Sequence, residues 1–162
     1  MDVLRVGDEA HESLRSLVQR YGATLQLLAA GETVPGSYWG ESEAGLKGHI
    51  LYVRADTPLH SLLHELSHYV CMAPGRRQAL DRDAGGDDAE ECAVCYLQIV
   101  LSDEIAGFGQ ARMLADMDAW GYTFRHGSSR AWFENDAADA CIWLRQFGVL
   151  DEQGKPTFHP RT

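Results

Sequence analysis

The stretch LHSLLHELSHYVCM, residues 59–72, carries apolar side chains around most of the circumference of a helix. A helix that is apolar on nearly every face must lie inside the fold. Asp56, Thr57 and Pro58 precede it and offer an N-cap with proline in the first turn. Pro74 and Gly75 follow it and are expected to end it.

This helix contains His64-Glu65-Leu66-Ser67-His68, an H-E-x-x-H sequence. Two histidines four residues apart lie on the same helical face, with about 5–6 Å between their Cβ atoms, so both imidazoles can reach one ion. Glu65, beside the first histidine, then points at a ligand of that ion. The motif therefore predicts His64 and His68 as metal ligands.

A two-histidine site needs at least one more protein ligand, and the acidic run at residues 87–91 offers several. The helix expected to begin there has one polar stripe, formed by Glu91, Cys95, Gln98 and Ser102. The histidine helix has a stripe of its own, formed by His60, His64, His68 and Cys71. Two otherwise apolar helices are expected to bring their polar stripes together, which favours Glu91 as the third ligand over Glu90 and Asp88.

The remaining patterns predict short elements around these two helices. A helix is expected at residues 8–20 and two strands at 24–29 and 49–53, separated by a glycine-containing stretch. The ligand helix should run to about residue 105, and further helices are expected at 109–120 and 136–146, before a tail of turn and coil from 148 to 162. We expect an α+β fold, with a short sheet packed on the metal-bearing helices, as a single domain over residues 1–162.

The composition of the chain limits the classes of protein and partner to be considered. The 162 residues suit one domain, and 45% hydrophobic and 23% charged residues are globular values that argue against disorder. The net charge of −10 argues against nucleic acid or an anionic membrane as a partner. The oligomeric state is left open by the sequence.

The compartment is expected to be the cytoplasm. No apolar run approaches the length of a spanning helix, and residues 1–10 lack the basic start and apolar middle of a signal peptide. The four cysteines are too few and too irregularly spaced for a secreted disulfide framework, so they are interpreted as reduced thiols. Cys92-x-x-Cys95 lies within an expected helix and is interpreted as two small core thiols.

The motif follows an expected strand, a short capped connection and the start of a helix. In this setting residues 37–101 resemble the zincin metallopeptidases, especially the small glutamate-type members. The resemblance implies a zinc-dependent hydrolase acting on a peptide or protein. It implies His64 and His68 as metal ligands, Glu65 as the general base and a carboxylate ligand from a second helix. Glu90 matches the E-x-x-A start of that ligand helix in several such families, but Val94 stands where they often place Asp or Asn.

Under this interpretation a zinc-bound water has its pKa lowered toward ~7 and gives its proton to Glu65. Tyr122, His126 and Arg130 are candidates for stabilising the oxyanion that forms. The strand at 49–53, or the Tyr38-Trp39 segment, could pair with an extended peptide substrate.

A second resemblance leads to another reaction. The stretch HELSHYVCMAPGRRQALD, residues 64–81, is similar to the bacterial elongation factor P hydroxylases. That resemblance implies a non-haem iron, and two histidines with one carboxylate also suit iron(II). A third interpretation, a zincin-like protein that binds a partner without turnover, is disfavoured because binding a metal does not require Glu65.

Overall fold

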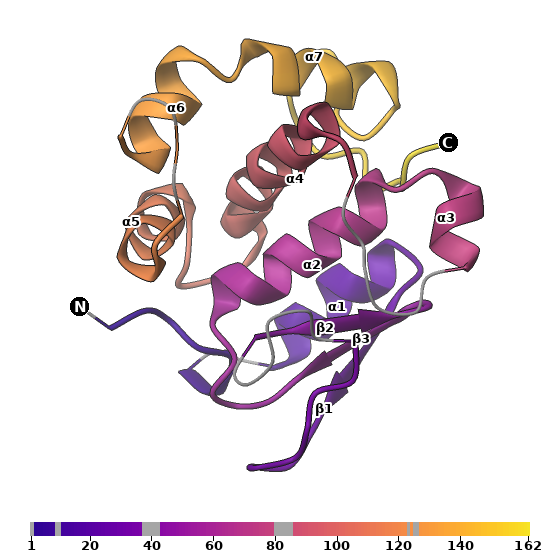
Figure 1. Ribbon diagram of the computed structural model, residues 1–162, viewed down its shortest axis with the longest axis vertical. Helices are drawn as coiled ribbons and strands as arrows, with labels where there is room; N and C mark the ends of the chain where they lie inside the picture. The colour runs from indigo at the N-terminus through magenta and orange to yellow at the C-terminus, as the bar shows by residue number, and fades with distance from the viewer. Residues whose placement is uncertain (1, 9–10, 37–42, 80–85, 123, 125–126) are drawn as a thin grey trace.

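The computed structural model describes residues 2–8, 11–36, 43–79, 86–122, 124 and 127–162. Within these ranges the chain forms seven α-helices and a three-stranded sheet, which confirms the expected α+β class (Figure 1). The elements in chain order are η1 (Val6–Asp8), α1 (His11–Arg20), β1 (Thr24–Leu27), β2 (Gly45–Lys47), β3 (Ile50–Val53), α2 (Leu59–Cys71), α3 (Pro74–Gln78), α4 (Asp88–Leu101), η2 (Ser102–Glu104), α5 (Gln110–Trp120), α6 (Ser129–Asn135) and α7 (Ala138–Gln146).

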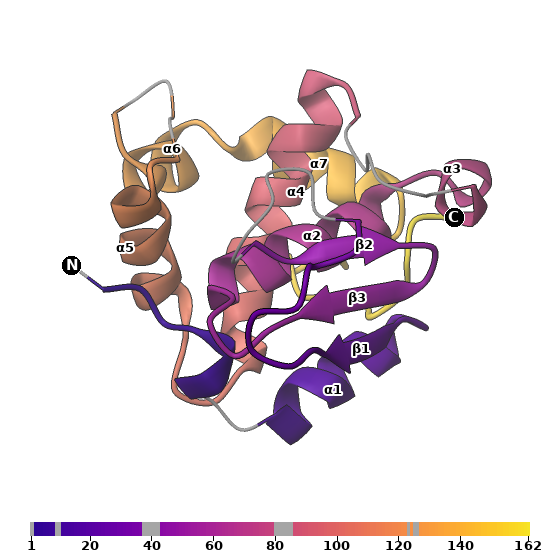
Figure 2. The ribbon, with the colours of Figure 1, turned by 60° about the horizontal axis from the view of Figure 1, so that its bottom comes forward.

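Strand β3 lies at the centre of the sheet, parallel to β1 and antiparallel to β2 (Figure 2). The sequence predicted β1 and β3 but not β2, because three residues are too few to show an alternating pattern. Gly48 and His49 form the two-residue turn between β2 and β3, and Gly48 has a φ of +62°, as such turns require. His49 therefore lies in the turn and not in the strand.

The position of β3 overturns one expectation. Because β3 has a neighbour on each side, its backbone is already paired, and the prediction that the strand at 49–53 binds an extended peptide is wrong. The alternative segment, Tyr38-Trp39, lies outside the described residues.

Helix α2 is buried, as its sequence requires. It packs against the sheet and makes its most extensive contact with α4 (Figure 1). Its leucines have no exposed surface, and each contributes about 1.5–3 kcal/mol relative to an exposed side chain. These leucines are Leu59, Leu62, Leu63 and Leu66. The contacts on both sides fix the orientation of the helix and therefore of its histidines.

The start of α2 differs from the prediction. Pro58 is the N-cap residue and no side chain caps the helix, so the expected cap by Asp56 or Thr57 is wrong. Thr57 Oγ1 instead accepts a hydrogen bond from Arg54 N at 2.9 Å, and the Asp56 carboxylate binds the Arg54 guanidinium at 2.7 Å. The helix does end before Pro74, but residues from Pro74 onward form the short helix α3 and not a plain turn.

The C-terminal helices cover the far side of α4, where α7 makes the main contact. Helices α5 and α7 confirm the two helices expected there, with slightly shorter bounds, and α4 ends at Leu101 before the turn η2. Helix α6 was not predicted, because its seven residues follow a stretch rich in glycine and polar residues. Ser128 caps it by accepting a hydrogen bond from Ala131 N at 3.1 Å.

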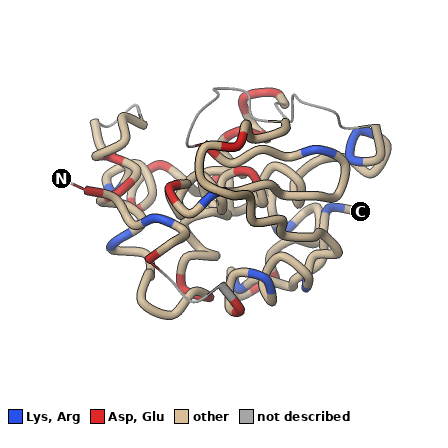
Figure 3. Tube along the Cα trace, turned by 90° about the horizontal axis from the view of Figure 1, so that it is seen from below, with Lys and Arg blue, Asp and Glu red and all other residues tan. Residues whose placement is uncertain are grey.

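The C-terminal tail returns to the end of α2, where Arg161 N donates to Val70 O at 2.8 Å. Acidic and basic residues both lie in short stretches scattered along the described chain (Figure 3). All four cysteines are free thiols, and Cys95 is buried as expected, but Cys92 is exposed, so the prediction that both thiols of Cys92-x-x-Cys95 lie in the core is wrong. Within the described ranges, no helix has both the length and the apolar character needed to cross a membrane.

Candidate metal centre

Helix α2 brings His64 and His68 together on the face that packs against α4. Their Nε2 atoms are 3.1 Å apart, and their rings meet edge to face with centroids 4.7 Å apart. His68 is buried and His64 is half-buried. The helical spacing of four residues thus directs both imidazoles to one point, as the motif predicted.

Helix α4 adds a carboxylate at the same point. Glu91 Oε1 lies 3.3 Å from His64 Nε2, and Glu91 Oε2 lies 3.4 Å from His68 Nε2. Asp87 caps the helix by accepting a hydrogen bond from Glu90 N at 2.8 Å, which starts α4 one turn before Glu91. The ligand atoms of all three residues lie within 4.8 Å of one another.

These separations suit a single divalent cation. With zinc–ligand bonds of about 2.0–2.1 Å and tetrahedral angles, two ligand atoms stand ~3.3 Å apart. The observed distances of 3.1, 3.3 and 3.4 Å are close to that value. Two imidazole nitrogens and one carboxylate leave a coordination position open, as in catalytic sites.

Without an ion, the neighbouring side chains shift the pKa values of His64 and Glu91. Burial works to lower the pKa of His64, but Tyr122, Cys95 and Glu91 together raise it well above its usual value. Burial works to raise the pKa of Glu91, but the hydrogen bond from His64 and the neighbouring charges of His68 and His64 lower it. Glu91 is therefore a carboxylate at neutral pH, ready to bind a cation.

Gln98 contacts Nδ1 of His64, the ring nitrogen that does not face Glu91. Its side chain is fully buried on α4, and its Oε1 lies 2.6 Å from His64 Nδ1. The sequence placed Gln98 on the same stripe as Glu91 but gave it no role. Gln98 follows Glu91 by seven residues, about two helical turns, so both lie on the face of α4 that is turned to the histidines. This spacing is the sequence signal that points to a role for Gln98 at the site.

Tyr122 lies beside the histidines, where a donor to the oxyanion is expected. Its ring is 5.8 Å from that of His64, and its hydroxyl lies 3.2 Å from His60 Nδ1. Burial raises the pKa of Tyr122 to about 12, so the hydroxyl keeps its proton at neutral pH. Burial also lowers the pKa of His60 to about 3, with smaller contributions from His64 and Arg5, so His60 is neutral.

The carboxylate of Glu90 has different partners from the carboxylate of Glu91. Its buried carboxylate accepts hydrogen bonds from Arg76 at 2.8 and 3.1 Å, and Arg161 Nη1 lies 3.3 Å from it. Because those two guanidinium groups hold it, the structure does not bring Glu90 to the histidines. Asp88 is exposed at the start of α4 and is not part of the group either.

Glu65, His126 and Arg130 were also predicted to act at the site. Glu65 is half-buried on α2, and its carboxylate is not among the ligand atoms that cluster within 4.8 Å. His126 lies outside the described residues. Arg130 is exposed on α6, where it pairs with Glu134 at 3.2 Å, so the structure does not bring it to the metal centre.

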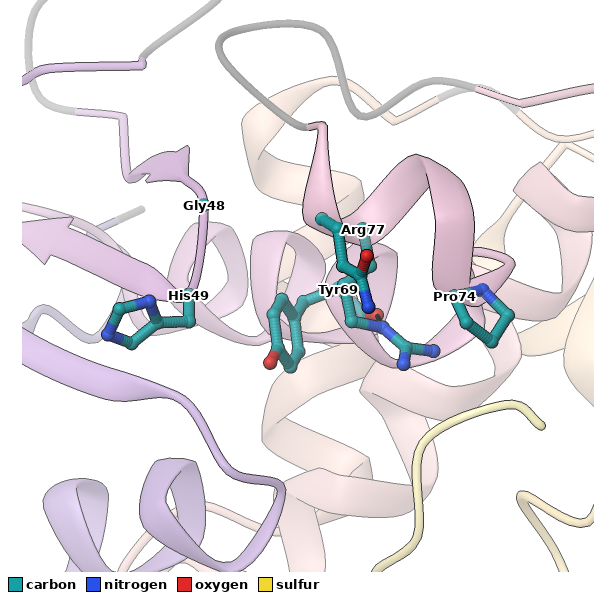
Figure 4. Close-up of a pocket in the computed structure, with 6 residues that line it drawn as sticks. Gly48, His49, Tyr69, Pro74 and Arg77 are labelled. Carbon is teal, nitrogen blue, oxygen red and sulfur yellow. Dashed lines mark hydrogen bonds between the residues drawn. The ribbon is translucent and has the colours of Figure 1, made fainter.

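A separate pocket lies near the C-terminal end of α2 (Figure 4). It has a volume of about 410 Å³. Its lining residues are Gly48, His49, Tyr69, Pro74, Arg77 and Gln78. The Arg77 guanidinium is occupied by backbone carbonyls of α2 and the tail, including Met72 O at 2.6 Å. None of the three clustered ligand residues lines this pocket.

A scan against protein-family models matches no family, and neither a search of curated proteins nor a search of solved structures returns a match.

Proposed function

We propose that this protein is a zinc-dependent hydrolase that cleaves peptides or proteins. The observation that carries the proposal is the convergence of His64, His68 and Glu91. Glu65 follows His64 in the H-E-x-x-H motif, in which this glutamate acts as the general base, and metal binding alone does not require it. We propose the cytoplasm as its compartment, because the four free thiols suit a reducing environment.

In this proposal His64, His68 and Glu91 hold the ion through neutral imidazoles and a carboxylate. A bound zinc would supply a water of pKa about 7 and would polarise the carbonyl of the substrate. Glu65 would accept the proton of the attacking water and pass it to the leaving amine. The buried surroundings of His68 strengthen these charge interactions by excluding water from one side.

Tyr122 is our proposed donor to the oxyanion that forms on the substrate. Its hydroxyl is protonated at neutral pH, since burial raises its pKa to about 12. In the structure the hydroxyl contacts His60 Nδ1, so this role requires it to turn from His60 toward the substrate. His126, four residues further along the chain, is proposed for the same role from the sequence alone.

The proposal is tested by changing Glu65 to Gln. We expect the zinc content to stay the same and cleavage of denatured casein or a peptide library to fall by about 10²- to 10⁴-fold, because the proton acceptor is lost. Glu134→Gln, an exposed change on α6, is the matched control and should cleave at the wild-type rate. Retained cleavage by Glu65→Gln would remove Glu65 as the base, and no cleavage by zinc-loaded wild type would overturn the peptidase proposal.

The same donor set supports a second function. Two histidines and one carboxylate with open positions also bind iron(II) in oxygenases, so a hydroxylase is the alternative proposal. The two are separated by their requirements. A peptidase works with zinc and without oxygen, whereas a hydroxylase needs iron(II), oxygen and a reductant. Metal binding with neither activity would favour a protein that binds a partner without turnover.

A further inference from the structure

The side chain of Gln98 joins α4 to two histidine residues of α2. Its Oε1 lies 2.6 Å from His64 Nδ1, and its Nε2 donates to the backbone carbonyl of His60 at 3.2 Å. Nε2 also lies 3.8 Å from Met113 Sδ, a weak acceptor. The amide is fully buried, so water does not compete for these contacts.

The carbonyl of His60 fixes which way the amide faces. A backbone carbonyl can only accept a hydrogen bond, so the NH₂ group of Gln98 must face it and the amide oxygen must face His64. At 2.6 Å two acceptors would repel each other, so a proton must lie between Gln98 Oε1 and His64 Nδ1. His64 Nδ1 therefore carries a hydrogen.

We infer that Gln98 is a positioning residue that selects the Nδ1-protonated form of His64. A neutral imidazole with its hydrogen on Nδ1 has its lone pair on Nε2, the atom that faces Glu91 and His68. Without Gln98, the neutral ring would place its hydrogen on Nε2, where the Glu91 carboxylate accepts it, and the lone pair would point away from the ion. The inference rests on the proposed metal centre for its functional meaning, but the proton position is a property of the chain alone.

The first test is made on metal-free protein by nitrogen-15 NMR of the histidine rings, at a pH above the titration of His64. Wild type should show His64 protonated at Nδ1. Gln98→Met keeps a similar volume but accepts no comparable hydrogen bond, so we expect the proton to move to Nε2. An Nδ1 proton that persists in Gln98→Met would overturn the inference.

The second test is zinc affinity, measured by competition with a chelator. Loss of an outer partner of a metal-bound histidine typically costs 10- to 100-fold, so we expect about that loss in Gln98→Met. Gln98→Glu keeps an acceptor facing His64 Nδ1 but loses the donor to the His60 carbonyl, so it should recover part of the affinity lost in Gln98→Met. Ser102→Ala is the matched control, because it removes another buried hydrogen bond of α4, to Ile99 O, without touching a histidine, and it should bind zinc as wild type does.

The outcomes separate the two proposals. Wild-type zinc affinity in Gln98→Met would overturn the role of Gln98 while leaving the metal centre intact. If wild type itself binds neither zinc nor iron(II), the metal centre fails, and the NMR result on metal-free protein still decides whether Gln98 sets the proton of His64. A Gln98→Met protein that does not fold would be replaced by Gln98→Leu and judged by the same two measurements.

Discussion

Glu90 and Glu91 are neighbours of identical chemistry whose carboxylates have different partners. Successive residues of a helix point about 100° apart, so only one of the two can face α2. Glu91 faces the histidines, and Glu90 turns to Arg76 and Arg161. At the scale of single residues, the rotation of α4 therefore decides which carboxylate is the ligand.

Exchanging each carboxylate for an amide should separate the two roles. Glu91→Gln removes a ligand and should weaken zinc binding at least about 100-fold, since even outer partners cost 10- to 100-fold. Glu90→Gln should keep zinc binding but lower the free energy of unfolding by about 2 kcal/mol. This is less than the usual cost of breaking a fully buried ion pair, because Arg76 is partly exposed. Chelator competition and urea unfolding measure the two effects. The reverse assignment, with zinc lost only in Glu90→Gln, would contradict the structure.

Much of the site was predictable from residues alone. The H-E-x-x-H spacing predicted His64 and His68, and the polar stripes of the two helices favoured Glu91. What the sequence left open was the fate of Glu90, because one of its partners, Arg161, lies 71 residues away and local patterns carry no trace of such a contact. Gln98 was visible on the stripe, but its role depends on a carbonyl of another helix.

At the scale of elements, the start of α4 controls the site. Asp87 accepts a hydrogen bond from the backbone of Glu90 and so fixes the first turn, from which Glu91 projects. Asp87→Ala should lower the free energy of unfolding by about 1 kcal/mol, the usual cost of losing an N-cap, and should weaken zinc binding in parallel. Asp88→Ala is the matched control in the same turn, where only the helix dipole is affected, by about 0.5 kcal/mol. Equal effects of the two changes on zinc affinity would contradict this role of the cap.

Among the helices and among the strands, the longer elements were predicted and the shorter ones were not. Helices α2, α4, α5 and α7 show apolar residues at helical spacing over two turns or more, which is enough to identify them. Strand β2 has three residues and exists because β3 pairs with it, and helices α3 and α6 have five and seven. Such short elements depend on tertiary contacts that no local period encodes.

At the scale of the whole molecule, His60 should make the fold sensitive to acid. Burial holds the pKa of His60 at about 3, against 6.5 for the free side chain, so below pH 6.5 the unfolded chain binds a proton that the folded protein does not. Stability due to this residue is therefore present at neutral pH and lost as the pH falls. The loss should be about 2 kcal/mol between pH 7 and 5.

The comparison with His60→Gln isolates this contribution, because the other titrating groups are the same in both proteins. Urea unfolding with chelator present, at several pH values, should show wild type losing stability faster than His60→Gln. Parallel pH profiles of the two proteins would show that His60 is not buried in its neutral form.

Metal content tests most directly whether one ion is held between α2 and α4. Protein reconstituted with zinc or iron(II), freed of excess metal and analysed for elements should retain about one equivalent of the ion. His64→Ala and His68→Ala should retain essentially none, while folding as judged by circular dichroism. Wild-type protein that retains no metal, or histidine variants that retain the full equivalent, would contradict a metal centre at His64, His68 and Glu91.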